Sequence, residues 1–171
     1  ITWASNKNLC IQRMNRLQNK IELMFANAAD GKSKVILTEE AKTYIDITDN
    51  LTFLPDNKGF IWSSEMDEFN LLYYYDINGK LVNQITKGNW DVIEFKGYDA
   101  KTSTLFYTSA ERGAINRDLY SVKLNGTAKK LLSTAEGTTD ADFTNGYKYY
   151  VSSYSNANTP TVFELHTADG K

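Results

Sequence analysis

The chain has 171 residues, with 19 basic and 21 acidic side chains and a formal net charge of −2. This balance excludes the basic field that holds nucleic acid or an anionic membrane surface, so no nucleic-acid partner is expected. Hydrophobic residues make up 42% and charged residues 23%, which excludes disorder and favours a single folded region over residues 1–171. The lone cysteine, Cys10, excludes a disulfide within the chain and is predicted to be buried and inert.

The first predicted repeat covers residues 1–43. Its predicted strands are residues 1–3, 11–14, 21–26 and 35–38. The pair Asp30-Gly31 supplies a hairpin turn before the last of them. Glu39-Glu40 then follows the outer strand. We interpret this acidic pair as a solvated turn, with room for one turn of helix over residues 39–43.

The second predicted repeat covers residues 44–88 and shows the pattern most clearly. Its predicted strands are residues 51–54, 60–63, 71–75 and 81–86, with Ile45 as another possible place for the first strand. The acidic residues 65–70 form a turn between the second and third strands. Asn78-Gly79 supplies the two positive-φ positions of a type I′ hairpin turn. Alternation within the third strand predicts that Tyr74 points away from Tyr73 and Tyr75.

The third and fourth predicted repeats cover residues 89–135 and 136–171. Their predicted strands are residues 92–98, 106–109, 119–124, 151–154 and 162–165. A long polar loop is expected over residues 110–118. The turns Asn125-Gly126 and Asp169-Gly170 match the earlier ones, but no outer strand follows the last of them.

Two landmarks recur together through the chain. The glycine turns return at a period of about 45 residues, and an apolar strand precedes each one at a similar distance. Four short strands per repeat at this period are typical of a β-propeller blade. The sequence therefore predicts an all-β fold: a partial β-propeller of about four blades, each a four-stranded antiparallel sheet, with incomplete blades at both ends.

The ends of the chain suggest a piece of something larger. It starts at Ile1 rather than Met, its first strand is a stub, and its last sheet lacks a strand. We expect an internal slice of a larger propeller, whose open sheet edges promote self-association of the isolated chain.

His166 is the only histidine, and the chain has no Gly-x-Ser-x-Gly nucleophile elbow. A single histidine can serve a catalytic triad, but no serine here has an elbow context. We interpret His166 as a structural strand residue and predict no catalytic residue in this chain. Histidine and cysteine do not cluster, so neither a metal site nor a cofactor is expected.

Two further groups of residues invite a functional interpretation. Large aromatic rings at Trp62, Trp90 and residues 73–75 can stack on a ligand, although packing between blades is the simpler interpretation. Acidic side chains can supply a calcium loop or the carboxylate pair of a glycosidase, although turn and cap chemistry also explains them. These acidic residues are Asp46, Asp49, Asp56, Glu65, Asp67 and Glu68.

Four stretches resemble the propeller domain of dipeptidyl peptidase IV, in the prolyl oligopeptidase family of serine peptidases. The family patterns are Asn-Arg-x-Gln-Asn, Trp-x-Ser-Glu-x-Asp-Gly-Phe-x-His-Leu-Tyr, Leu-Thr-x-Gly-x-Trp-x-Val and Asn-Leu-Tyr. The matching stretches are Asn15-Arg-Leu-Gln-Asn19, Trp62-Ser-Ser-Glu-Met-Asp-Glu-Phe-Asn-Leu-Leu-Tyr73, Ile85-Thr-Lys-Gly-Asn-Trp-Asp-Val92 and Asp118-Leu-Tyr120. They follow the family's order and cover most of residues 1–165.

The resemblance implies a parent enzyme that removes Xaa-Pro or Xaa-Ala dipeptides from peptide N-termini. Its catalytic Ser-Asp-His set would lie in an α/β-hydrolase domain of the same polypeptide, and peptides would be its substrates. The propeller would cap the active site and gate access to it, so this chain alone is expected to be inactive. The resemblance also implies a secreted, periplasmic or cell-surface location.

The match has departures that limit what it transfers. Glu68 and Leu71 replace a family Gly and His, which leaves the conformation of the turn at Glu68 open. A Phe-Arg pair that lines the substrate pocket of the mammalian enzymes is absent near Asp46-Ile47. The family's Glu-Glu pair, which holds the substrate amine, lies earlier in the propeller, so Glu39-Glu40 is not equated with it. Substrate-binding residues therefore remain unassigned. A scaffold propeller without an enzyme and a propeller glycosidase remain alternatives.

Overall fold

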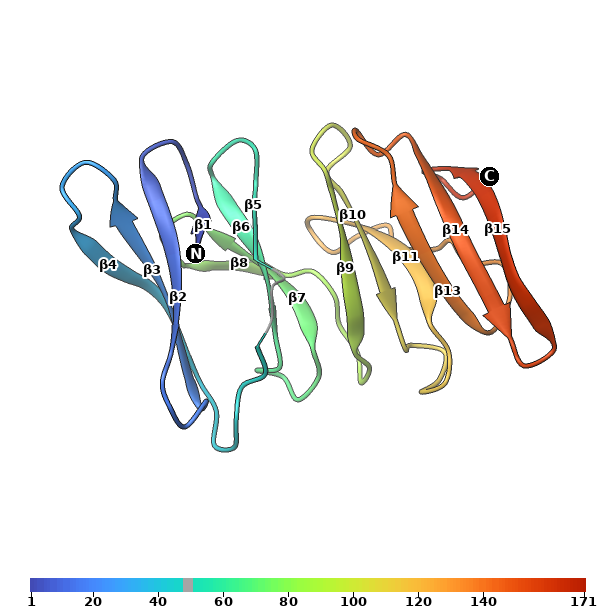
Figure 1. Cartoon of the computed structure of the whole chain (residues 1–171), viewed down its shortest axis with the longest axis horizontal. Helices are drawn as coiled ribbons and strands as arrows, with labels where there is room; N and C mark the ends of the chain where they lie inside the picture. The colour runs from blue at the N-terminus through green and yellow to red at the C-terminus, as the bar shows by residue number, and fades with distance from the viewer. Residues whose placement is uncertain (48–50) are drawn as a thin grey trace.

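The computed structural model describes residues 1–47 and 51–171, and in those residues the chain forms fifteen β-strands and no helix. Asp49, one of the candidate acidic residues, lies outside the described part. The strands form four antiparallel sheets that follow one another in a row (Figure 1). Each sheet is a meander in which every strand pairs with its neighbour in sequence. The predicted all-β partial propeller with incomplete end blades is confirmed.

The first two sheets contain four strands each. The first comprises β1 (Thr2–Trp3), β2 (Asn8–Met14), β3 (Lys20–Asn27) and β4 (Ser33–Glu40). The second comprises β5 (Thr52–Phe53), β6 (Gly59–Ser64), β7 (Leu71–Asp76) and β8 (Leu81–Gln84).

The last two sheets contain four and three strands. The third comprises β9 (Val92–Asp99), β10 (Thr104–Ser109), β11 (Asp118–Lys123) and β12 (Lys130–Leu131). The fourth comprises β13 (Thr138–Phe143), β14 (Tyr149–Asn156) and β15 (Thr159–Thr167).

The helical turn expected over residues 39–43 is wrong. Glu39 and Glu40 belong to β4, where they pair with Ile21 and Lys20 of β3. The ladder between these two strands continues to the end of β3, so the backbone of the acidic pair is held in extended conformation.

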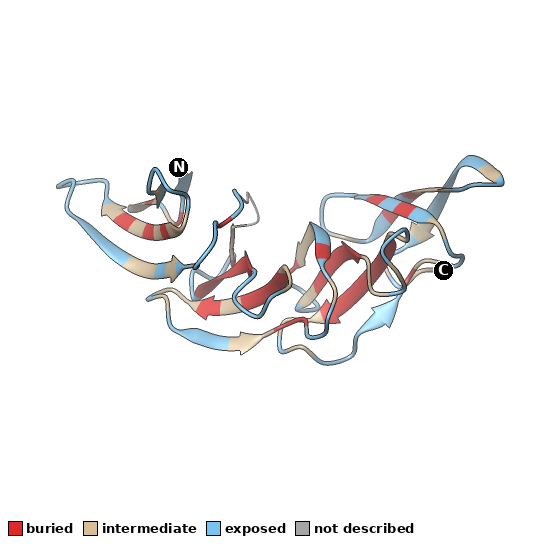
Figure 2. Cartoon of the chain, turned by 90° about the horizontal axis from the view of Figure 1, so that it is seen from below, coloured by how far each residue is buried: buried red, intermediate tan, exposed pale blue. Residues whose placement is uncertain are grey.

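Strand alternation packs each central sheet against both of its neighbours. On β6, Phe60 and Trp62 face the first sheet, whereas Ile61 between them faces the third. On β10, Tyr107 faces the second sheet and Phe106 the fourth. Buried residues therefore concentrate in the two central sheets, while the outer sheets are more exposed (Figure 2).

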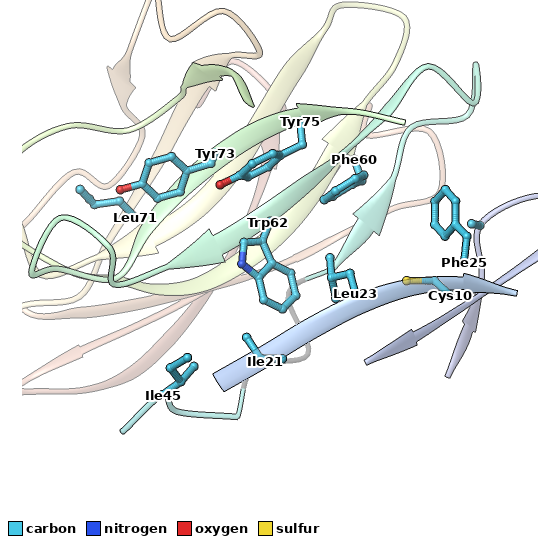
Figure 3. Close-up of a cluster of buried hydrophobic side chains, with 11 residues drawn as sticks. Cys10, Ile21, Leu23, Phe25, Ile45, Phe60, Trp62, Leu71, Tyr73 and Tyr75 are labelled. Atoms are coloured by element: carbon cyan, nitrogen blue, oxygen red, sulfur yellow. The ribbon is translucent and has the colours of Figure 1, made fainter. Parts of the chain in front are cut away.

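The packing between the first two sheets shows how aromatic and aliphatic side chains divide the space. Trp62 and Phe60 of the second sheet lie over Ile21 and Leu23 of β3 (Figure 3). Cys10 is fully buried beneath this cluster, and burial raises the pKa of its thiol to about 11. The thiol therefore stays protonated at neutral pH, as expected of an inert residue.

Tyrosines along β7 also follow the predicted alternation. Tyr73 and Tyr75 join the cluster between the first and second sheets, whereas Tyr74 packs on the opposite side against the third. Trp90 stacks on Tyr107 at a ring-centroid distance of 6.2 Å. These aromatic residues, together with Trp62, pack between the blades.

The predicted type I′ turn at Asn78-Gly79 is wrong. Gly79 has a φ of 82°, but Asn78 is not among the residues with positive φ. The amide of Gly79 donates to the carbonyl of Asp76 at 3.0 Å, and Asp76 in turn donates to the carbonyl of Lys80 at 2.9 Å. This is a type I turn followed by a glycine bulge, a hairpin that needs only one left-handed residue.

The turn between β6 and β7 answers the question that the sequence left open at Glu68. Glu68 adopts a φ of 73°, and its amide donates to the carbonyl of Glu65 at 2.9 Å. A glutamate thus occupies the left-handed conformation that glycine adopts without a steric penalty.

The outer face of the fourth sheet carries exposed apolar side chains. Phe163 and Leu165 of β15 are each 70% exposed, next to the exposed Val151 of β14. No strand of the described chain pairs with the outer edge of β15. None of the described segments forms a helix that is long and apolar enough to cross a bilayer.

Candidate functional site

A cavity of about 580 Å³ opens between the first two sheets, where β4 ends and where β6 turns into β7. We call it the acidic pocket. Five carboxylates line it together with several apolar side chains. The carboxylates are Glu39, Glu40, Asp46, Glu65 and Glu68, and the apolar side chains include Tyr44, Ile45, Ile47, Trp62 and Met66.

Glu39 is the most firmly held carboxylate in the acidic pocket. Its Oε2 accepts a hydrogen bond from the indole Nε1 of Trp62 at 3.0 Å, and its Oε1 accepts one from Ser64 Oγ at 2.7 Å. Both donors belong to β6 of the second sheet, so these bonds join two blades. The interpretation of Glu39 as part of a solvated turn is therefore wrong, because its side chain is fixed by the neighbouring blade.

Residues 41–47 form one wall of the pocket and are anchored to the first sheet. The amide of Ala41 donates to the carbonyl of Asn19 at 3.0 Å, and that of Ile45 donates to the carbonyl of Gln18. The Ile45 side chain is buried beside Ile21 (Figure 3). These contacts place Asp46 at the rim of the pocket.

The turn over residues 65–70 forms the opposite wall. The amide of Met66 donates to Ser64 Oγ at 3.1 Å, which begins the turn. Asn70 ends it, because its amide donates to Asp91 Oδ1 at 2.8 Å and its side chain donates to the carbonyl of Val92 at 2.7 Å. The positive φ of Glu68 bends the chain between these two anchors.

The charges of the acidic pocket are only partly compensated. Glu40 forms an ion pair with Lys20 at 2.9 Å, on the surface side of β4. Among the described residues, no cation lies within ion-pair distance of Asp46, Glu65 or Glu68. Burial raises the pKa of Glu65, and the negative charges of Asp46, Asp91 and Glu39 raise it further.

His166 is not arranged as the base of a serine triad. Its Nε2 lies 3.0 Å from Ser152 Oγ and 3.6 Å from Glu164 Oε2, so both partners approach the same ring nitrogen. In a triad the nucleophile and the orienting carboxylate occupy opposite nitrogens. Ser152 lies within strand β14 rather than on an elbow, and the His166 ring stacks on Tyr150 at 4.9 Å.

Other candidate acidic residues are engaged in local structure. Asp67 Oδ2 accepts a hydrogen bond from the hydroxyl of Tyr73 at 2.8 Å. Asp56 Oδ1 accepts one from the amide of Lys58 at 3.0 Å, inside the turn before β6. Within residues 1–47 and 51–171, no group of three or more His, Cys, Asp or Glu side chains is placed to hold a metal ion.

Sequence reasoning identified the acidic residues but not the pocket that they form. Asp46, Glu65 and Glu68 were interpreted as turn residues, whereas the structure brings them together with Glu39 around one cavity. The available signal was the abundance of carboxylates on both sides of the second blade's first strands.

The meandering sheets and their face-to-face packing define the chain as part of a β-propeller. The family model for the dipeptidyl peptidase IV (DPP IV) N-terminal region matches residues 1–161. The chain therefore belongs to the dipeptidyl peptidase IV N-terminal region family.

Solved structures with the same fold come from two bacteria. The crystal structure of Porphyromonas gingivalis dipeptidyl peptidase 4 matches with a TM-score of 0.89 and 38% identity, over 96% of this chain and 23% of that one. A putative dipeptidyl aminopeptidase IV from Bacteroides ovatus matches with a TM-score of 0.84 and 24% identity, over 99% of this chain and 27% of that one. The second likeness shows the fold alone.

Curated fungal relatives match at lower identity. A probable dipeptidyl-aminopeptidase B of Arthroderma otae is 23% identical over 92% of this chain and 19% of its own length. A dipeptidyl peptidase 4 of Trichophyton equinum is 24% identical over the whole of this chain and 23% of its own length. The chain thus spans about a fifth to a quarter of the curated relatives that it matches.

Proposed function

We propose that this chain is a non-catalytic part of the propeller of a dipeptidyl peptidase IV-like serine exopeptidase. The parent enzyme releases Xaa-Pro or Xaa-Ala dipeptides from peptide N-termini, using a Ser-Asp-His set in an α/β-hydrolase domain of the same polypeptide. The observation that carries this proposal is the family match over residues 1–161, combined with a chain that has no nucleophile elbow.

In this proposal the propeller covers the catalytic domain and restricts which peptides reach it. Closure of an active site excludes bulk water and admits only chains that fit the opening. The tight packing between successive blades supports this role, because aromatic clusters join the first sheet to the second and the second to the third. A rigid wall of this kind keeps the opening constant in size.

The test uses the full-length polypeptide that contains this chain. We expect it to hydrolyse a chromogenic Ala-Pro amide, and to release dipeptides from a short Ala-Pro peptide much faster than from a folded protein with the same N-terminus. Equal rates on the peptide and the folded protein would contradict gating. No turnover of either Ala-Pro substrate or an Ala-Ala amide would contradict the peptidase assignment.

We also propose that the isolated chain self-associates, and that the parent works in the periplasm, at the cell surface or outside the cell. Self-association is supported by the exposed Phe163 and Leu165 on the outer face of the last sheet. Localisation is supported only by the family, and fractionation of cells that express the full-length polypeptide tests it.

A further inference from the structure

We propose that the acidic pocket binds a positively charged side chain, an arginine guanidinium or a lysine ammonium, carried by a peptide. The peptide as the source of this cation rests on the proposed function, whereas binding of the cation rests only on the pocket. The inference starts from the cavity itself. Its volume of about 580 Å³ lies within the range of about 300–1,000 Å³ that is typical of small-ligand sites.

The charge of the lining selects the sign of the ligand. Five carboxylates line the cavity, and none of the described lining residues is basic. One of the five, Glu40, already pairs with Lys20, which leaves Asp46, Glu65 and Glu68 without a cation. An incoming cation therefore gains attraction from several carboxylates without having to displace a protein cation.

Glu39 gives the site a fixed acceptor at its inner end. Hydrogen bonds from Trp62 and Ser64 hold both of its carboxylate oxygens, so the side chain needs no reorganisation when a ligand arrives. Each carboxylate oxygen has a second lone pair available for another donor. A guanidinium or ammonium group donates from several N–H bonds and suits such an acceptor.

The rim of the pocket suits the aliphatic part of the same ligand. Tyr44 and Ile47 are 64% and 70% exposed, and Met66 is 46% exposed on the opposite wall. The methylene stem of an arginine or lysine packs on apolar surface of this kind while its charged head reaches a polar group. A small metal ion makes no use of such walls, and the described carboxylates do not form a metal-binding group.

The test compares N-acetyl-arginine amide with N-acetyl-citrulline amide, measured by calorimetry or NMR titration on the full-length polypeptide at low salt. The two probes have nearly the same shape, but only the first is charged, and both lack a free α-amine. We expect the arginine derivative to bind about tenfold more tightly, because charge-assisted hydrogen bonds exceed neutral ones. Equal affinities of the two probes would overturn the proposal.

Substitutions then locate the binding. The isosteric variants Glu65→Gln and Asp46→Asn should each weaken the arginine derivative several-fold, with little effect on the citrulline derivative. Glu136→Gln removes the same charge from an exposed position after β12 and should leave the affinity unchanged. Unchanged affinity in both pocket variants, or an equal loss in Glu136→Gln, would overturn the proposal.

A last probe separates side-chain binding from amine binding. Alanine amide carries its only charge on the α-amine and should bind more weakly than the acetylated arginine probe. Tighter binding of alanine amide would overturn the side-chain assignment. Because no step of this test involves cleavage, failure of the peptidase assay leaves its outcome intact, and retained discrimination between arginine and citrulline still supports the pocket.

Discussion

The indole N–H of Trp62, on β6, donates a hydrogen bond to the carboxylate of Glu39, on β4, over 3.0 Å. Trp62 is 1% exposed, so its donor has no access to bulk water. The same carboxylate accepts a hydrogen bond from Ser64. One acidic side chain of the first sheet therefore satisfies two donors of the second sheet at the boundary between them.

Replacement of Glu39 should therefore destabilise the boundary between the first two sheets. Glu39→Ala leaves two donors without an acceptor, and we expect a loss of about 2–4 kcal/mol in the free energy of unfolding, measured by chemical denaturation. Glu40→Ala is the matched control, because Glu40 only pairs with Lys20 at the surface, and it should change stability by less than about 0.5 kcal/mol. Similar losses in the two variants would contradict this account.

Two buried tyrosines differ in whether their hydroxyl has a partner. The Tyr73 hydroxyl donates to Asp67, whereas the Tyr107 hydroxyl is buried with no hydrogen-bond partner. We expect Tyr73→Phe to lower the free energy of unfolding by about 1–2 kcal/mol, and Tyr107→Phe to leave it unchanged or to raise it. The reverse order in parallel urea denaturations would show that the two hydroxyls have been misjudged.

These contrasts also show which part of the structure the sequence predicted. Alternation along residues 71–75 placed Tyr73 and Tyr75 on one face and Tyr74 on the other, because strand periodicity is a local property. The role of Glu39 depends on Trp62, 23 residues further along and on another sheet, so no local pattern signals it. The acidic pocket was missed for the same reason.

Turn types were predicted less well than strands. Asn78-Gly79 fits both a type I′ turn and a type I turn with a glycine bulge, and the sequence does not distinguish them. The structure adopts the second, in which only Gly79 needs a positive φ. Glu68 adopts a similar conformation without being glycine, held by the anchors at both ends of its turn.

Glu65 should make stability depend on pH in a defined direction. Burial raises its pKa above the ordinary value of 4.5, and Asp46, Asp91 and Glu39 raise it further. The folded state therefore binds the proton more tightly than the unfolded state, and Glu65 lowers stability as pH rises from below 4.5 through its raised pKa. Glu65→Gln should raise the melting temperature at pH 7, with a gain that disappears below pH 4.5. A gain of the same size at both pH values would contradict this reasoning.

The exposed face of the fourth sheet should drive self-association of the isolated chain. We expect the sedimentation coefficient of the isolated chain to rise with concentration, and a Phe163→Ser, Leu165→Ser double variant to reduce that rise. Both side chains are 70% exposed on one sheet face, so their replacement removes apolar surface without opening a core. Ile115→Ser is the control, because Ile115 is 89% exposed in the loop before β11. A strictly monomeric wild-type chain at high concentration would contradict the prediction.

Peptide hydrolysis by the isolated chain and by the full-length polypeptide tests the central claim most directly. Both proteins are assayed side by side with the same chromogenic Ala-Pro amide, after repurification to remove contaminating peptidases. The account predicts release of the chromophore by the full-length polypeptide and none by residues 1–171 alone. Turnover by the isolated chain that survives repurification, or none by the full-length polypeptide, would contradict it.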